Sequence, residues 1–171
     1  MFEGACGVCY DETDMEINVL FDEGFEGCLD AEWLESIARA ALAAQGIGDD
    51  VEMGLVVTSQ QRVQELNRTY RGQDKPTDVL AFALLPETGV EPDLSFTAPP
   101  DGVKHLGEVI ISYPQAVRQA EERQHSLKRE VAILVIHGVL HLLGYDHIES
   151  DETALMSGRE AEILRIVEAD L

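Results

Sequence analysis

Apolar positions recur along this chain with two periods, one typical of strands and one typical of helices. Four short segments with alternating or continuous apolar residues predict strands at 16–21, 51–58, 79–85 and 106–112. Five longer segments with apolar residues three or four positions apart predict helices at 31–45, 60–71, 114–124, 127–143 and 150–167. Strands interspersed with helices indicate an α/β or α+β domain in which a sheet packs against helices.

Polar residues mark where these helices are expected to begin. Asp30, Ser59 and Ser126 each precede a helical segment, and Ser150 opens the last one with two acids behind it. Such side chains accept hydrogen bonds from the unpaired N–H groups of a first helical turn. Pro114 suits a first turn for the opposite reason, because its missing N–H needs no partner there.

Two segments lack the apolar periods found in the rest of the chain. Residues 1–15 are acidic and have no apolar period, so we predict a flexible acidic N-terminal extension before one domain at 16–171. Residues 86–103 are rich in proline and predict an exposed loop. The spacing of Cys6 and Cys9 is that of some metal and redox sites, but an isolated pair is a weak signal.

Charge gives two opposing indications about partners. The formal net charge of −21 repels phosphate backbones, and the first 38 residues hold eleven acids and no Lys or Arg. Four bases nevertheless fall within fourteen residues, at Arg62, Arg68, Arg71 and Lys75. No apolar run reaches membrane-spanning length and no basic leader is present. We therefore expect a cytoplasmic protein with no membrane partner and no DNA partner.

The most specific signal is a run of three histidines, His137, His141 and His147. Positions four apart share one face of a helix, so the first two can reach the same ion. Gly144 can then end the helix in a left-handed turn that brings His147 back toward it. Three imidazoles with open coordination positions are typical of a catalytic zinc site, whereas core histidines bonded to backbone are the alternative.

The residue at position 138 distinguishes this histidine spacing from that of a known class of metalloprotease. Metzincin proteases carry HExxHxxGxxH, with the same histidine offsets, and their glutamate is the general base beside the metal. Glycine stands in that place here and has no side chain to take a proton. The spacing therefore favours a metzincin-like metal helix without the protease chemistry.

Three stretches resemble the YbeY family of bacterial metal-dependent endoribonucleases, which act in ribosomal RNA maturation and ribosome quality control. They are His137-Gly-x-Leu-His141-Leu-x-Gly144-Tyr-Asp146-His147, Leu66-Asn-x-x-Tyr-Arg71-x-x-Asp74-x-Pro-Thr77-Asp78-Val-Leu80-x-Phe82, and Leu106-Gly107-Glu108-Val-x-Ile-Ser112. The resemblance covers about residues 50–165. It implies a single α+β (α/β-like) domain with a small mixed four-stranded sheet and about five helices, one Zn²⁺ on the three histidines, and a functional arginine at Arg71.

The roles of the remaining candidates follow from chemistry once the resemblance is given. Arg71 and His137 are the predicted catalytic residues, although an arginine at a helix end can also bind the last carbonyls or pair with Asp74. Asp146 is predicted to orient an imidazole, the alternative being proton transfer. Asp78 is an accessory candidate, either near the metal or in a turn.

Together these predictions indicate a zinc-dependent endoribonuclease that cleaves single-stranded ribosomal RNA, with a water or a ribose hydroxyl as the attacking group. The expected partners are ribosomal RNA and the small ribosomal subunit or its proteins. The alternative is a ribosome-associated assembly factor with a mainly structural metal, or another metallohydrolase.

Overall fold

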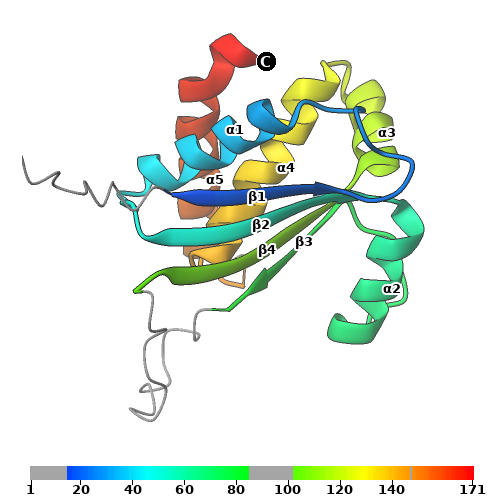
Figure 1. Cartoon of the computed structure of the whole chain (residues 1–171), viewed down its shortest axis with the longest axis horizontal. Helices are drawn as coiled ribbons and strands as arrows, with labels where there is room; N and C mark the ends of the chain where they lie inside the picture. The colour runs from blue at the N-terminus through cyan, green and yellow to red at the C-terminus, as the bar shows by residue number, and fades with distance from the viewer. Residues whose placement is uncertain (1–14, 85–101, 147) are drawn as a thin grey trace, which may run out of the picture.

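The computed structural model describes residues 15–84, 102–146 and 148–171, in the element order shown in Figure 1. The strands are β1 (Glu16–Phe21), β2 (Val51–Thr58), β3 (Val79–Ala83) and β4 (Lys104–Ser112). The helices are α1 (Ala31–Ala44), α2 (Gln60–Arg71), α3 (Tyr113–Arg123), α4 (Leu127–Leu142) and α5 (Ser150–Val167), followed by the short 3-10 turn η1 (Glu168–Asp170).

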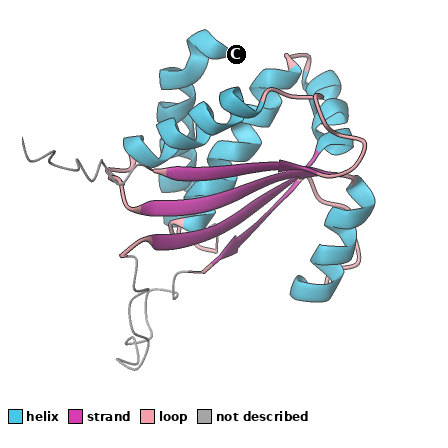
Figure 2. Ribbon diagram, in the orientation of Figure 1, coloured by secondary structure: helices cyan, strands magenta, loops and turns pink. Residues whose placement is uncertain are grey.

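The four strands form one mixed sheet in the order β1-β2-β4-β3. The first three of these are parallel neighbours, whereas β3 runs antiparallel to β4 at the edge. Helices α1, α4 and α5 lie on one side of the sheet and α2 on the other (Figures 1 and 2). The predicted α+β fold with a small mixed four-stranded sheet and five α-helices is confirmed.

Helix α4 is buried because its sequence is apolar on nearly every face. It contacts β3 and β4 beneath it and α1, α3 and α5 around it. A helix that is hydrophobic all round belongs in an interior, where burying each large aliphatic side chain contributes about 1.5–3 kcal/mol. The two histidines near its end are thus carried by the most enclosed helix of the fold.

The first turn of α4 also carries a buried charge. Glu130 is 0% exposed, and its carboxylate contacts Arg123 Nη1 at 2.7 Å and His125 Nε2 at 2.5 Å. A buried carboxylate is tolerated only when such partners satisfy it. The contact ties the start of α4 to the end of α3, and it shows that His125 is engaged in the fold.

The helix starts agree with the predicted caps, with one difference. The side chains of Asp30, Ser59 and Ser126 accept hydrogen bonds from the backbone N–H three residues ahead. At α5 the capping position is Glu149 rather than Ser150, which is already the first helical residue. Glu149 uses its backbone carbonyl, which accepts bonds from both the amide and the hydroxyl of Thr153. Ser150 is therefore not needed as a cap.

A register shift in β4 depends on Gly107. Glu52 and Met53, adjacent in β2, pair with His105 and Gly107, so β4 holds one extra residue there. Gly107 has φ +126°, and a Cβ at this position would lie 2.0 Å from the carbonyl oxygen of Phe82. Only glycine permits this approach of β3 to β4.

The N-terminal boundary needs one correction. Met15, which the sequence pattern assigns to the extension, is buried in the core, and its carbonyl accepts a hydrogen bond from Arg39 Nη2 at 2.9 Å. A single apolar residue before a strand has no period, so the pattern does not reveal it. The predicted flexible extension otherwise lies outside the described residues, as do most of the 86–103 loop, Cys6 and Cys9. Within the described ranges, no helix is long and apolar enough to span a bilayer.

Candidate metal centre

Helix α4 brings His137 and His141 together, as their spacing predicts. Their Nε2 atoms are 3.1 Å apart, and the two rings meet at an angle of 71° with centroids 4.6 Å apart. Both side chains are half-buried at the end of an otherwise enclosed helix. The pair therefore presents two ring nitrogens to one point.

This arrangement fits a zinc ion. Zinc binds histidine nitrogen at about 2.0–2.1 Å, so two nitrogens on a tetrahedral ion lie roughly 3.3–3.4 Å apart. The observed 3.1 Å separation needs only a small ring adjustment to match. Elsewhere in residues 15–84, 102–146 and 148–171 no third His, Cys, Asp or Glu completes a ligand set, and His147 itself is outside those ranges.

Glu160 of α5 contacts the ring of His137 on the side away from His141. The sequence pattern did not predict this contact. Its Oε1 atom lies 2.5 Å from His137 Nδ1, and both side chains are half-buried. In a neutral imidazole, a carboxylate at Nδ1 holds the proton there and leaves the lone pair on Nε2. Nε2 is the nitrogen that faces His141, so the contact sets the tautomer that a metal requires.

Gly138 has a second role besides lacking a side chain for proton transfer. A Cβ at this position would lie 2.4 Å from Cγ1 and 2.9 Å from Cγ2 of Val109 in β4. Real Cβ atoms do not approach other atoms this closely, so α4 packs on the sheet at a distance that only glycine allows. A glutamate at 138, like any residue with a Cβ, would require Val109 to move.

Replacing Gly138 with alanine is expected to destabilise the protein by about 1–2 kcal/mol, because the clash with Val109 outweighs alanine's better helix propensity. Urea unfolding followed by circular dichroism measures this change. Gly158 in α5 is the matched control, since a Cβ there meets nothing within 4 Å and alanine should stabilise by roughly 0.5–1 kcal/mol. Adding Val109→Ala should recover part of the Gly138→Ala loss, and a purely additive double mutant would contradict the clash.

The turn after α4 follows the predicted hinge. Gly144 has φ +94°, and the amides of Gly144 and Tyr145 bond back to the carbonyls of His141 and Leu140. The hydroxyl of Tyr145 donates to Gln45 Oε1 at 2.7 Å, which fixes the turn to the end of α1. Asp146 is exposed just beyond it, and its role as an orienting partner stays a prediction together with ligation by His147.

Arg71 ends α2 and reaches the edge strand β3. Its Nη2 donates to the carbonyl oxygen of Ala81 at 3.2 Å, and the side chain is exposed. The alternative pairing with Asp74 is not the contact formed, since Asp74 Oδ1 accepts from Gln64 at 3.0 Å. Helix α4 contacts the same strand β3. Arg71 and the histidine helix thus share this strand, although they come from helices on opposite sides of the sheet.

Asp78 lies at the start of β3 and has partners there. Its Oδ1 accepts from the amide of Val79 at 2.8 Å, and its Oδ2 accepts from Gln119 of α3 at 3.2 Å. These contacts join β3 to α3, as the turn interpretation expects. A separate role near the metal stays a prediction. Glu108 is exposed, and it lies on the side of β4 opposite to Val109 and α4.

The cysteine within the described residues gives no metal ligand. Cys28 is a free thiol, and burial raises its pKa above the usual value, so it stays protonated at neutral pH. A metal ligand is a thiolate, which this environment disfavours.

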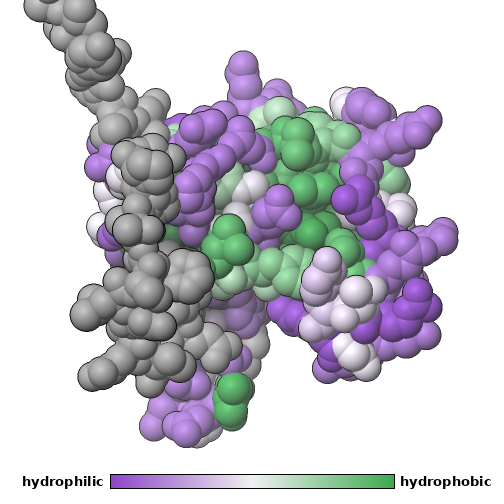
Figure 3. Space-filling view, turned by 60° about the horizontal axis from the view of Figure 1, so that its bottom comes forward, coloured by the Kyte–Doolittle hydropathy of each residue, from purple (hydrophilic) through white to green (hydrophobic). Residues whose placement is uncertain are grey.

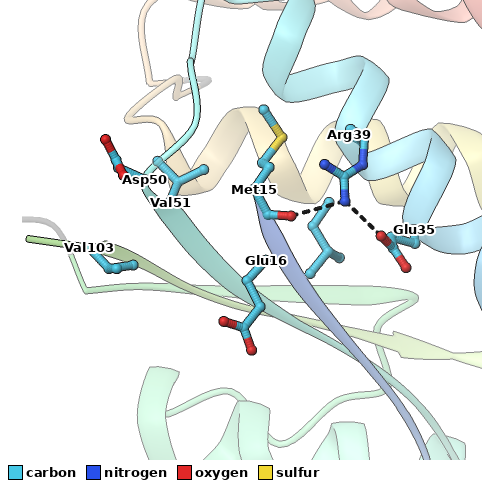
Figure 4. A pocket seen from close by; sticks show the side chains of 8 residues that line it. Met15, Glu16, Glu35, Arg39, Asp50, Val51 and Val103 are labelled. Carbon is cyan, nitrogen blue, oxygen red and sulfur yellow. Dashed lines mark hydrogen bonds and ion pairs between the residues drawn. The ribbon is translucent and has the colours of Figure 1, made fainter. Parts of the chain in front are cut away.

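A hollow of about 480 Å³ lies at the starts of β1 and β2 (Figure 4). Three of its lining residues are acids, Glu16, Glu35 and Asp50, and the single base Arg39 is bonded to Glu35 and to the backbone of Met15. It is lined by none of the predicted site residues. An acidic lining of this kind repels phosphate, so the hollow is not a nucleic-acid cleft.

The fold and site define a class, a small mixed-sheet α+β protein whose buried helix presents two convergent histidines backed by a carboxylate. The chain belongs to the YbeY family, since the family model described as Endoribonuclease YbeY matches residues 28–168. The match begins before the 50–165 stretch that carries the motif resemblance, so it takes in α1.

Relatives named Endoribonuclease YbeY are similar over most of their length. A protein of Dehalococcoides mccartyi strain BAV1 is 49% identical over 149 residues, which cover 85% of this chain and 92% of that protein. A protein of Moorella thermoacetica is 51% identical over 131 residues, covering 77% and 82%. The solution structure of a Thermotoga maritima protein superimposes with a TM-score of 0.55 at 26% identity, covering 90% of this chain and 93% of that one.

Proposed function

We propose that this protein is a zinc-dependent endoribonuclease that cleaves single-stranded ribosomal RNA in the cytoplasm, in rRNA maturation and ribosome quality control. Membership of the YbeY family and relatives named as endoribonucleases support the reaction class. The small ribosomal subunit or its proteins are the partners that this role requires. The zinc ion, the RNA class and the ribosomal partners are parts of the proposal.

The proposed metal site rests on one observation. The side chains of His137 and His141 converge, and Glu160 contacts the other ring nitrogen of His137. Half-buried histidines at this spacing are stabilised by polar partners, and a shared ion satisfies both ring nitrogens at once. The contact from Glu160 is the outer partner that metal-bound histidine usually has. His137, His141 and His147 would hold the ion, with Asp146 as a second orienting group.

Each of the chain's own groups then has a defined task. Zinc, when bound, activates a water and polarises the phosphoryl group as a Lewis acid at neutral pH. Arg71 offers a planar guanidinium that binds two phosphate oxygens and offsets charge developing on them. Its present hydrogen bond goes to the uncharged carbonyl of Ala81 at 3.2 Å, and a phosphate, which carries a negative charge, can replace this acceptor with a stronger one.

The test compares zinc content and cleavage of a ribosomal RNA precursor for the parent, Arg71→Glu and Arg71→Lys. Arg71→Glu should keep its zinc and lose roughly 10²–10³-fold in cleavage rate, as when a transition-state donor is removed. Arg71→Lys should be intermediate, since lysine keeps the charge without the bidentate geometry. Arg118→Glu on α3 is the control for the same change of charge on another helix, where the side chain contacts Gln115.

Two outcomes would redirect the proposal. Unchanged cleavage by zinc-loaded Arg71→Glu refutes the role of Arg71. If the parent binds zinc but cuts RNA no faster than a variant without the metal site, the enzymatic proposal fails and an assembly factor with a structural metal takes its place.

A further inference from the structure

An exposed aromatic ring stands next to Arg71 on α2. Tyr70 is 68% exposed, although tyrosine is a large amphipathic side chain that folding usually covers in part. Its ring contacts Phe82 of β3, with centroids 5.4 Å apart at an interplanar angle of 67°. The contact holds the Tyr70 ring in place and leaves most of it open to a partner.

The same end of α2 carries cations that the fold does not use in ion pairs. Within the described chain, Arg68, Arg71 and Lys75 form no salt bridge, whereas Arg62 at the other end of α2 pairs with Asp22 at 2.6 Å. The formal net charge of the protein is −21, so a polyanion is repelled by most of its surface. The aromatic ring thus lies where a polyanion can approach.

Tyr70 and Arg71 both contact strand β3. Arg71 donates to the carbonyl of Ala81, and Tyr70 packs on the next residue, Phe82. Figure 3 shows the side of the molecule that carries α2, where apolar side chains gather in the middle and hydrophilic ones border them. The ring and the guanidinium therefore contact two adjacent residues of one edge strand, which places them near each other.

We propose that Tyr70 is a base-stacking residue, on which an unpaired base of the RNA substrate lies while Arg71 binds a neighbouring phosphate. An exposed aromatic ring beside a cation that forms no ion pair is a combination that binds single strands, because every unpaired base has a π-face and every nucleotide a phosphate. A duplex offers no such face along its length, so the contact selects single-stranded RNA. The proposal rests on the proposed function, and it names the residue that would contact an unpaired base of that RNA.

The test is equilibrium binding of a fluorescent single-stranded oligoribonucleotide to the full zinc-loaded chain, with the RNA checked for cleavage afterwards. Tyr70→Ala and Tyr70→Leu should weaken binding by about 5- to 100-fold, because both lose the π-face. Tyr70→Phe should bind within about twofold of the parent, since stacking does not need the hydroxyl. Ile166→Ala, which removes another exposed apolar side chain, is the control and should bind as the parent does.

Salt dependence separates stacking from charge. Tyr70→Ala should leave the slope of log K against log salt unchanged, whereas Arg71→Ala should reduce it by about 0.7, the value for one phosphate contact with a single strand. Zinc content should match the parent for every Tyr70 variant, and the melting temperature should fall only slightly in Tyr70→Ala, which loses the ring contact with Phe82. In cleavage, Tyr70→Ala should raise KM more than it lowers kcat.

The possible outcomes distinguish failure of the stacking inference from failure of the proposed endoribonuclease function. If the parent cleaves RNA and the Tyr70 variants bind like the parent, stacking is wrong and the enzyme stands. If Tyr70→Phe is as weak as Tyr70→Ala, the hydroxyl and not the ring face is responsible, which overturns the inference. If single strands bind through Tyr70 but no RNA is cut, the stacking site stands and the endoribonuclease proposal fails.

Discussion

Replacing His141 with alanine is expected to remove the zinc ion and reduce RNA cleavage to the background level. The substitution deletes one of the two nitrogens that converge within 3.1 Å, so His137 loses the partner with which it shares the ion. Metal affinity should fall by more than roughly 100-fold, the upper end of what loss of an outer partner alone costs. Metal analysis after gel filtration and cleavage of an rRNA precursor measure both effects.

Glu160→Ala provides a graded comparison in the same experiment. It leaves the ligands intact but frees the His137 ring from the carboxylate at Nδ1, so zinc affinity should fall by about 10- to 100-fold. His105→Ala is the matched control, because His105 lies on β4 and pairs with Glu52 rather than with the site. Its zinc content and cleavage should equal those of the parent.

Thermal unfolding gives a readout that does not depend on activity. At free zinc 100 times above its Kd, the parent should gain about 2.7 kcal/mol of stability, and His141→Ala should gain almost none at the same concentration. Equal stabilisation of the two proteins by zinc would show that the ion binds elsewhere, and the assignment of the site would be wrong.

Replacing Gly107 with alanine is expected to destabilise the domain by about 4 kcal/mol, a large part of the 5–15 kcal/mol typical of a folded domain. Two costs add at this position. The backbone has φ +126°, which strains any residue with a side chain, and the new Cβ would meet the Phe82 carbonyl oxygen at 2.0 Å. Since backbone atoms form the obstacle, β3 must move away from β4.

Gly72→Ala separates these two costs. Gly72 also has positive φ, at +65°, but a Cβ there meets nothing within 4 Å, so its replacement should cost only about 1 kcal/mol. Urea unfolding of the two variants measures the difference, which contains the clash and the greater backbone strain at φ +126°. Similar losses of stability in the two variants would indicate that β3 can move away from β4 at little cost in free energy. The clash would then contribute little.

Local signals in the sequence were enough to predict the elements and their number. Strand and helix periods, the caps at Asp30, Ser59 and Ser126, and the glycine turn at Gly144 all act over a few residues, so they can be recognised from the chain alone. The cap of α5 and the inclusion of Met15 in the core were missed, because a backbone carbonyl and a single apolar residue leave no pattern.

The candidate site was predictable only where its residues lie close in sequence. The spacing of His137 and His141 on one helix foretells their contact, whereas Glu160 is brought in by the packing of α5. A signal for it exists in retrospect. Glu160 shares the inner face of α5 with Met156 and Ile163, and a carboxylate on an apolar face needs a partner.

The bond from Arg71 to Ala81 illustrates a different limit. Sequence reasoning offered Asp74 or the end of α2 as its partner, both within a few positions along the chain. The observed acceptor belongs to the edge strand, and it is selected by how α2 crosses the sheet. That crossing depends on contacts of distant residues, such as the packing of Val63 with Val56, Leu80 and Ile110.

The buried carboxylate of Glu130 has a consequence for the order of folding and metal uptake. It anchors the first turn of α4 to α3. Further along α4, Gly138 packs closely on Val109 of the sheet, and after the helix Tyr145 bonds to Gln45 at the end of α1. The helix is thereby oriented by protein contacts alone. In a zinc finger, metal binding supplies the folding energy; here we expect the domain to be folded without an ion, so that zinc binding, under the proposed function, would follow folding.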